Sequence, residues 1–225
     1  KILKKKKIII FYIEKNSDNN DCDILIDYKC NLKTSQLHAV LLHTSNDLIG
    51  KYSKKIYKAL YKLKEEGLTN KIGVSVYNPD ETFSICQEYD LDMVQLPLNI
   101  FDQRFRSGKC IEFLSSRGID VHVRSVFLQG LLLMRRENLP TKFNRWMESW
   151  NIWHDWLEKT KIDAVSACLN AISEDPNVDS IVVGIESKQQ LVEIINAETK
   201  RIGIQVPDFN LKSELLLNPS NWSSL

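Results

Sequence analysis

The sequence lacks the glycine-rich patterns with which many proteins hold nucleotide phosphates. Its 225 residues include only 8 glycines and 6 prolines, and neither GxGxxG nor GxxxxGK follows any of its apolar runs. These patterns supply the tight turn and the backbone N–H groups of Rossmann and P-loop sites. Their absence argues against both kinds of nucleotide-binding domain.

Paired cysteines, an excess of charge and a long apolar segment are missing as well. The five cysteines form no CxxC pair and no Cys/His cluster, so we predict no metal site and expect reduced thiols in a cytoplasmic protein. With 30 basic and 29 acidic residues, the net charge of +1 gives no reason to expect nucleic acid as a partner. No apolar run approaches the ~18 residues of a membrane span, so we expect no membrane association.

An initial methionine, a signal peptide and an internal linker are also absent. We expect an N-terminally incomplete chain without a secretion signal. Because no low-complexity or Pro/Gly-rich tract divides the sequence, residues 1–225 are expected to form a single domain.

Short runs of Val, Ile and Leu are the predicted strands. They are nearly continuous rather than alternating, which is typical of parallel strands buried on both faces. The predicted strands are Lys7–Ile13, Leu37–His43, Lys71–Ser75, Met93–Leu96, Asp120–Ser125 and Ser180–Gly184.

Helical patterns with recognisable ends separate these runs. Gly67 is a C-terminal stop, Asn78 and Asp163 are N-caps, and Ser187 with Gln190 forms a capping box. Repeated strand–helix units predict an α/β fold with a parallel sheet. The pattern alone leaves two architectures open, a doubly wound sheet and a (β/α)8 TIM barrel.

Polar residues stand where successive predicted strands end. They are His43, Ser75, Gln95 with Asn99, Arg124–Ser125, and Gly184 to Ser187. Each has an ordinary structural explanation as a turn residue, a cap or a hydrogen-bonded side chain. In a barrel, however, the carboxyl ends of all strands meet at one mouth, so the series as a whole predicts a site. The helix start at Ser187 adds a candidate anion site.

The sequence resembles the aldo/keto reductases. The resemblance covers Leu37 to Ala197 and rests on "AVLLHTSND", "LYKLKEEGLTNKIGVSVYNPDE", "DMVQLPLNIFDQR", "GIDVHVRSVFLQGLLL" and "SIVVGIESKQQLVEI". It implies a (β/α)8 TIM barrel and an NAD(P)H-dependent oxidoreductase that transfers hydride reversibly between nicotinamide and a carbonyl. The "FDQRF" and "VRSVFLQGLLLM" variants are similar to bacterial members associated with surface-polysaccharide genes, which implies a sugar-related substrate.

The resemblance assigns His43 as the histidine that orients the carbonyl. Ser75 and Gln95 match the residues that hold the nicotinamide carboxamide, with Asn99 beside them. Val76 stands where the family usually has an Asn, which removes one expected hydrogen bond to the cofactor.

Two further segments match the family's dinucleotide site. Ser125, Phe127, Gln129 and Gly130 fall in the loop that wraps the pyrophosphate, with Val126 in place of a proline. Gly184, Ser187, Lys188 and Gln190 fall in the adenosine-phosphate segment. Glu186 stands where many members carry a basic residue, and an acid there repels a 2′-phosphate. The cofactor is therefore expected to be NADPH or NADH.

The family's other catalytic residues have no counterpart. The resemblance implies a tyrosine acid tuned by a lysine and an aspartate, but the "DTA…YG" segment is not present. Tyr12 and Tyr28 lack its context, and Lys15 lies beyond the matching strand. We expect a barrel without its first two β/α units and with impaired catalysis. The alternative is a non-catalytic, degenerate barrel that binds a nucleotide or a protein.

Two remaining segments carry weaker signals. Trp146, Trp150, Trp153 and Trp156 share one helical face, which is typical of core packing; an aromatic wall over a substrate or a partner is the alternative. The tail from Pro207 to Leu225 is expected to pack on the barrel, with a weak strand candidate at Leu215–Leu217.

Overall fold

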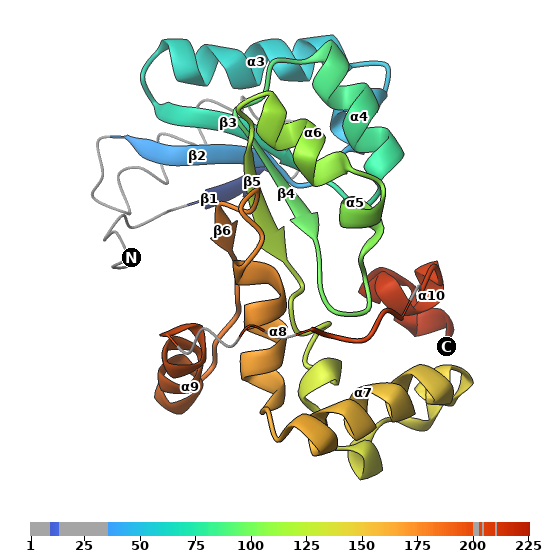
Figure 1. The fold of residues 1–225 in the computed structure, drawn as a ribbon. Coiled ribbons are helices and arrows are strands. Elements are labelled where there is room, and N and C mark those ends of the chain that lie inside the picture. Colours follow the sequence, from blue (N-terminus) through green and yellow to red (C-terminus); the bar gives the residue numbers. More distant parts are fainter. Residues whose placement is uncertain (1–9, 14–35, 200–202, 204, 210) are drawn as a thin grey trace. The chain divides into compact units, whose positions relative to one another are not determined.

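The computed structural model describes residues 10–13, 36–199, 203, 205–209 and 211–225. The chain divides into two compact units, one formed by Lys1–Gln95 and Phe113–Asp120, the other by Leu96–Glu112 and Val121–Leu225. The single domain expected over residues 1–225 stays a prediction. Figure 1 labels the helices and strands of both units.

Parallel strands form the sheet of the first unit. They are β1 (Ile10–Ile13), β2 (Leu37–Leu42), β3 (Thr69–Ser75) and β4 (Met93–Pro97), and they pair in that order. Val40 of β2 lies opposite Ile72 of β3, and Val94 of β4 lies opposite Val74. These four side chains lie on one face of the sheet and are buried, and Ala39, Leu41 and Met93 on the other face are buried too, which confirms the prediction of strands covered on both faces. Residues 7–9 of the first predicted strand lie outside the described part of the chain.

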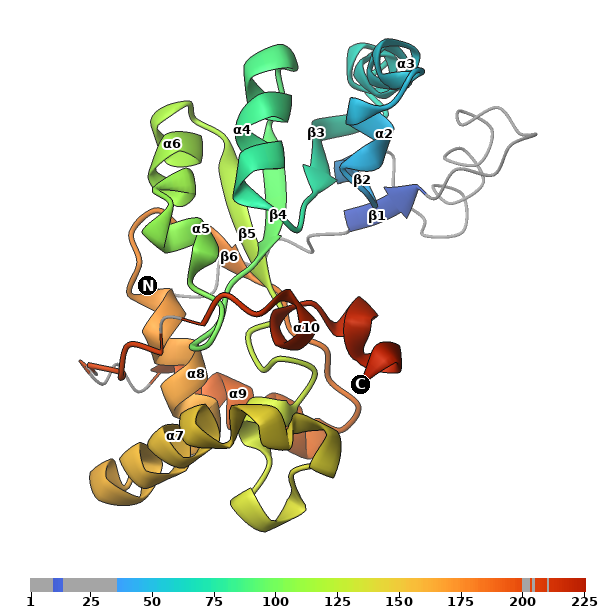
Figure 2. The ribbon, with the colours of Figure 1, turned by 90° about the vertical axis from the view of Figure 1, so that its right-hand side faces the viewer.

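Helices α2 (Asn46–Ile49), α3 (Ser53–Glu65) and α4 (Pro79–Glu88) belong to the same unit. Figures 1 and 2 show α3 and α4 on one side of the strands. Helix α3 buries Leu60 and Leu63. Gly67, at a φ of +70°, ends the helix, and the Leu68 N–H that follows it donates to the Leu63 carbonyl at 2.9 Å. Helix α4 begins as predicted, because Asn78 Oδ1 accepts from the Asp80 N–H at 2.8 Å.

Aspartates hold the amino ends of the strands, which the sequence patterns did not predict. Asp92 precedes β4, and its carboxylate accepts from the Ile72 N–H of β3 at 2.9 Å and from Lys64 at 2.6 Å. Lys71 forms an ion pair with Asp120. In the second unit, Asp179 likewise accepts from the Val121 N–H at 2.8 Å. The Asp92 and Asp179 carboxylates each satisfy a backbone donor of a neighbouring strand.

The second unit contains the end of the parallel sheet and most of the remaining helices. Strand β5 (Asp120–Arg124) pairs with β6 (Ser180–Ile181), with Val123 opposite Ile181. The helices are α5 (Arg104–Ser107), α7 (Met147–Thr160), α8 (Ala164–Ser173), α9 (Lys188–Thr199) and α10 (Glu214–Leu217); α6 (Cys110–Ser116) has residues in both units. The 3-10 segments are η1 (Leu131–Leu133), η2 (Arg136–Asn138), η3 (Thr141–Trp146) and η4 (Pro219–Ser224).

Strand β6 is shorter than the predicted Ser180–Gly184. Its last ladder contact joins Val182 N–H to the Val123 carbonyl at 2.7 Å. Two residues later, β5 has ended and Ser125 turns away at a φ of +60°. Residues 183 and 184 therefore have no partner on β5, and the expected strand stops early.

The tryptophan segment is mainly core. Trp150 and Trp153 of α7 are fully buried, and the Trp153 indole N–H donates to the Leu132 carbonyl at 3.1 Å. Trp150 lies 4.6 Å from Phe101 between ring centroids, and Trp156 stacks on Trp153 at 5.6 Å. Trp146 falls in η3 rather than in α7, so the predicted stripe of four is wrong at its first member. The core-packing interpretation is confirmed for Trp150 and Trp153.

The tail packs on the second unit, as expected. The ring of Trp222 meets Phe143 edge-on at 5.0 Å, and Lys142 Nζ donates to the Trp222 carbonyl at 3.0 Å. The strand predicted at Leu215–Leu217 is wrong: these residues lie in α10, where Leu216 and Leu217 are buried. A single helical turn buries two adjacent leucines without needing a strand partner.

Candidate functional site

Three predicted site residues stand level with one another in the first unit. Ser75 at the end of β3 lies opposite Gln95 of β4. Leu42 of β2 lies opposite Val74, so His43, the next residue, comes level with Ser75. Ser75 and Gln95 are in register and share a face, and His43 directly follows β2, so these three residues form a row at the carboxyl ends of β2, β3 and β4.

The members of this row differ in exposure. Ser75 and Gln95 are buried, whereas His43 is exposed. A serine hydroxyl and a primary amide together provide donors and acceptors, and an exposed imidazole can reach a small polar ligand. Val76, which follows Ser75, is fully buried and gives its N–H to the Gln95 carbonyl at 2.9 Å. Val76 therefore packs in the core and offers no side-chain hydrogen bond.

Asn99 organises the loop after β4 in the second unit. Its Oδ1 accepts from the N–H groups of Phe101 and Asp102, each at 2.9 Å, and its Nδ2 donates to the Ser125 carbonyl at 3.1 Å. The side chain is fully buried. Both Oδ1 lone pairs and one Nδ2 hydrogen are thus used within the protein, which leaves one hydrogen for a ligand.

A buried ion pair flanks Asn99. Asp102 is fully buried, and both its oxygens accept from Arg104, from Nε and from Nη2, at 2.8 Å. The hydrogen bond that Arg104 donates to Asp102, together with the charges of Asp102 and Glu214, raises the pKa of Arg104 above its ordinary value. The arginine stays cationic, and the loop that carries Asn99 is held by a two-pronged ion pair.

The loop from Ser125 to Gly130 has an unusual backbone. Ser125, Leu128 and Gln129 have φ angles of +60°, +46° and +53°, and Gly130 follows at +86°. Left-handed conformations of non-glycine residues cost energy and are concentrated at ligand sites. The predicted loop residues therefore lie together on a strained turn, with Gln129 exposed and Phe127 half-buried.

The predicted capping box at the start of α9 is confirmed with one difference. Ser187 Oγ accepts from the Gln190 N–H at 3.2 Å, as expected. Gln190 Oε1 accepts from the Glu186 N–H at 2.8 Å, not from that of Ser187. Both side chains are therefore engaged with the backbone at the helix start. The predicted residues of this segment, Gly184, Ser187, Lys188 and Gln190, are all exposed.

A pocket that the sequence patterns did not predict lies beside α9. Its volume is about 440 Å³, and its lining residues are Leu133, Asp163, Ala164, Val165, Ser166, Glu193, Asn196 and Ala197. The only sequence signal there was Asp163, recognised as a helix cap. Fourteen residues, 174–187, separate the end of α8 from the start of α9, so the polar residues of the two helices form no local motif.

Hydrogen bonds fix the walls of this pocket. Asp163 accepts from the N–H and the hydroxyl of Ser166, each at 2.8 Å. Asn170 Nδ2 donates to the Ser166 carbonyl at 2.9 Å and to the Ala197 carbonyl at 3.3 Å, which ties α8 to α9. Glu193 Oε1 accepts from Gln189 at 2.9 Å, so its other oxygen is the more accessible acceptor.

Thiol and metal chemistry find no support among the described residues. Burial raises the pKa of Cys86 to about 11 and also raises that of Cys168 above its ordinary value. Both thiols therefore stay protonated near neutral pH. In the described part of the chain, no group of three His, Cys, Asp or Glu side chains is placed to hold a metal ion. No helix there is long and apolar enough to cross a bilayer.

The buried thiols predict how stability changes at alkaline pH. Above the ordinary thiol pKa of 9.0, the unfolded chain releases a Cys86 proton that the folded protein keeps up to about pH 11. The free energy of unfolding should therefore fall as pH rises from 9 to 11, by about 1.4 kcal/mol at pH 10 for Cys86 alone. Urea denaturation at pH 8 and pH 10 measures this loss. Cys86→Ala should show a smaller loss, and an equal loss in both proteins would contradict the assignment.

Most of the predicted residues upstream of β2 lie outside the part of the chain that the structure describes. Lys15, Tyr28, Cys22 and Cys30 lie outside the described residues. Tyr12 lies in β1, opposite Leu41 of β2. Thus the described structure brings together His43, Ser75 and Gln95 in one unit, and Asn99 and Ser125 in the other.

Parallel strands, intervening helices and polar carboxyl ends define an α/β protein of the (β/α)8 barrel class. The chain matches the family model described as "Aldo/keto reductase family" over residues 13–206, and it belongs to this family. None of the curated protein sequences matches it.

Solved aldo-keto reductases share the fold. The holo form of AKR11C1 from Bacillus halodurans is 17% identical, with a TM-score of 0.66 over 88% of this chain and 69% of that one. The apo form is 19% identical, with a TM-score of 0.61 over 79% of this chain and 61% of that one. PA4992 of Pseudomonas aeruginosa, assigned as an aldo-keto reductase, is 15% identical, with a TM-score of 0.59 over 86% of this chain and 68% of that one. The predicted family and fold class are confirmed, and the chain spans about two thirds of these relatives.

Proposed function

We propose that this chain binds a nicotinamide dinucleotide and serves an aldo/keto reductase-type oxidoreductase that interconverts a carbonyl and an alcohol. The observation that supports this most directly is the row of His43, Ser75 and Gln95 at the carboxyl ends of β2, β3 and β4. Ser75 and Gln95 are in register and His43 directly follows β2, so three chemically different polar groups stand at one end of a parallel sheet. In this class of fold, that end carries the chemistry.

The residues of the row fit the nicotinamide end of the cofactor. A carboxamide has an N–H₂ donor and a carbonyl acceptor, and the Ser75 hydroxyl and the Gln95 amide offer the complementary groups. Their burial strengthens such hydrogen bonds, because little water competes there. When bound, the nicotinamide supplies or accepts the hydride.

The second unit, taken by itself, has features that suit a nucleotide phosphate and base. The strained loop Ser125–Gly130 has the character of a ligand-binding turn. The pocket beside α9 has room for a nucleobase and presents Glu193 and Asn196, which can accept from and donate to an aminopurine. The predicted segment Gly184 to Gln190 leads directly into α9.

His43 is the residue we assign to the carbonyl substrate. A neutral imidazole donates one N–H to the carbonyl oxygen and so orients it and stabilises developing negative charge there. The tyrosine, aspartate and lysine expected from the family have no matching motif in this chain. We therefore propose that the 225-residue chain binds cofactor but turns over slowly. A small carbonyl or alcohol, of sugar-related chemistry, is the proposed substrate.

A binding module without catalysis is the second candidate. Buried Val76 favours it, because this position offers no side-chain group to the cofactor. Fluorescence titration with NADPH and NADH, followed by hydride-transfer assays on simple aldehydes, separates the two functions. We expect saturable binding in which Gln95→Leu weakens affinity and His43→Ala does not. Binding without any turnover would support a nucleotide-binding module, and no binding of either nucleotide would defeat the oxidoreductase and leave only a protein-binding module.

Glu186 should set the choice between the two nucleotides. Its exposed carboxylate lies in the predicted adenosine-phosphate segment, where it repels a 2′-phosphate. Glu186→Lys should raise the affinity for NADPH relative to NADH by about fivefold, which is the effect of a screened surface charge. Glu198→Lys, another exposed acid on α9, is the matched control and should leave the ratio unchanged. An unchanged ratio of NADPH to NADH affinity in Glu186→Lys would mean that the 2′-phosphate does not lie near residue 186.

A further inference from the structure

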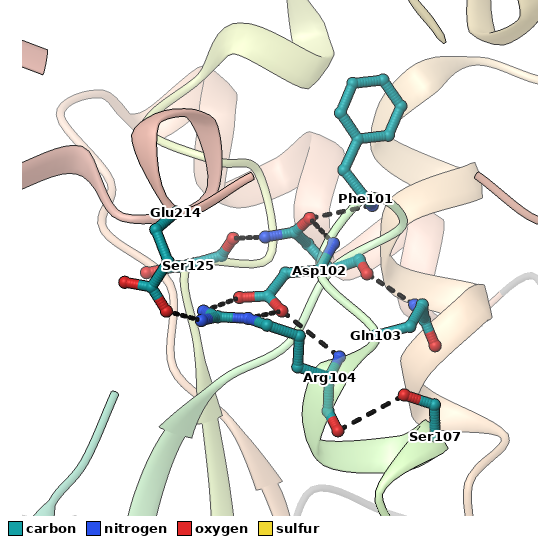
Figure 3. Close-up of polar contacts among 8 residues, drawn as sticks. Phe101, Asp102, Gln103, Arg104, Ser107, Ser125 and Glu214 are labelled. Carbon is teal, nitrogen blue, oxygen red and sulfur yellow. Dashed lines mark hydrogen bonds and ion pairs between the residues drawn. The ribbon is translucent and has the colours of Figure 1, made fainter. Parts of the chain in front are cut away.

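A series of polar contacts joins the C-terminal segment to the loop after β4 (Figure 3). Glu214, the first residue of α10, accepts from Arg104 Nη1 at 2.6 Å. Arg104 in turn holds both oxygens of Asp102 at 2.8 Å through Nε and Nη2. One guanidinium group therefore bridges a buried carboxylate in the loop and a carboxylate 110 positions further along the chain.

The series continues to Ser125 through the backbone of the same loop. Asp102 N–H donates to Asn99 Oδ1 at 2.9 Å, and Asn99 N–H donates back to the Asp102 carbonyl at 3.2 Å. Asn99 Nδ2 then donates to the Ser125 carbonyl at 3.1 Å. Asn99 and Asp102 are both fully buried, so these contacts have little competition from water.

Ser125 needs such support. Its φ of +60° is a left-handed conformation that a serine keeps only where its surroundings hold it. Its carbonyl accepts from Asn99 Nδ2 and from the Leu128 N–H of the same turn at 2.9 Å, and its Oγ accepts from Arg124 Nη1 at 3.2 Å. Ser125 also begins the strained turn that ends at Gly130. A shift of Asn99 would therefore be transmitted to the whole turn.

We propose that Glu214 is a positioning residue that sets the conformation of the Ser125–Gly130 loop through Arg104, Asp102 and Asn99, and thereby the affinity for cofactor. The effect on affinity rests on the proposed function, whereas the effect on the loop does not. The C-terminal segment in this way regulates the dinucleotide site without contacting the ligand.

The exposed fractions of the side chains indicate which contact of the series is the easiest to break. The Asp102 side chain is 0% exposed and that of Arg104 15%, so this pair behaves as a fixed unit. The Glu214 side chain is 60% exposed, so its ion pair is weak and open to water and to other ligands. Movement of α10 would therefore break the Glu214 contact first and leave the buried pair intact.

Charge reversal at Glu214 tests the proposal. Glu148 is the matched control, because it is also exposed and also lies in the first turn of a helix of the second unit. Hydrogen exchange of residues 124–132 reports on the loop, and nicotinamide nucleotide titration reports on the site. We expect Glu214→Lys to speed exchange and to raise the Kd by about fivefold, Glu214→Gln about twofold, and Glu148→Lys neither.

The two readouts distinguish the possible failures. Unchanged exchange of residues 124–132 in both Glu214 variants would overturn the positioning role, as would an equal change in Glu148→Lys. Faster exchange together with no nucleotide binding by the wild-type chain would support the loop coupling and overturn the proposed function instead. If Glu214→Lys does not fold, the isosteric Glu214→Gln variant decides by the same measurements.

Discussion

Replacing Arg104 with methionine should lower the free energy of unfolding by about 3–5 kcal/mol, since it leaves a buried carboxylate without its partner. Asp102 is fully buried and receives two hydrogen bonds from this one guanidinium group. Methionine fills much of the arginine volume, so the loss reports charge rather than a cavity. Urea denaturation at pH 7 measures it.

A double variant separates charge from packing at this pair. Asp102→Leu together with Arg104→Met removes both charges, and it should recover most of the lost stability. Arg136→Met is the control for arginine removal, because the ion-pair partners of Arg136 among the described residues are Asp155 and Glu158, which are both exposed. Its denaturation midpoint should match that of the wild type. A loss below about 1 kcal/mol in Arg104→Met would show that water reaches Asp102.

Gly73→Ala should be the most damaging single-methyl change in the first unit. A Cβ at residue 73 would lie 2.1 Å from the Met93 carbonyl oxygen and 2.9 Å from its carbonyl carbon. These atoms belong to the backbone of β4, so strands β3 and β4 would have to separate. We expect a loss of about 3 kcal/mol, at the upper end of overpacking effects, and loss of the Ser75–Gln95 register.

Two other glycines provide the controls for Gly73. Gly184→Ala places its Cβ in open space without a positive φ, so stability should stay within about 0.5 kcal/mol. Gly67→Ala also meets nothing, but its φ of +70° should cost about 1 kcal/mol. Chemical denaturation of the three variants measures the order of their free energies of unfolding. Equal stability of Gly73→Ala and Gly184→Ala would mean that the strands tolerate the extra methyl group.

Much of the fold could be predicted because buried parallel strands and helix caps leave local signals. The runs around Val40, Ile72 and Val94 are apolar on both faces, and Asn78 and Asp163 cap their helices as expected. Errors occurred where a neighbour decides the outcome. Residues 183 and 184 are not in β6 because β5 has already turned away, and Leu215–Leu217 is helical because a single turn buries Leu216 and Leu217.

The residues of the candidate site also fall into a group that the sequence could predict and a group that it could not. His43, Ser75 and Gln95 could be predicted because parallel strands align their carboxyl ends, whatever the loops do. Asn99 could be located by resemblance, but its bonds to the Phe101 and Asp102 N–H groups and to Ser125 could not be predicted. The Glu193 and Asn196 side chains carry no local pattern, so the pocket beside α9 appears only once α8 and α9 pack together.

The sequence by itself determined the strand–helix order, the family and the row of polar strand ends, because each depends on residues close together in the chain. Only the tertiary structure decided which polar groups are already engaged. Asn99 is committed to its own loop, Val76 to the core, and Arg104 to both Asp102 and Glu214. Hydrogen-bond partners and burial arise between segments far apart in sequence, and the free energy of each such contact depends on the exclusion of water that packing alone provides.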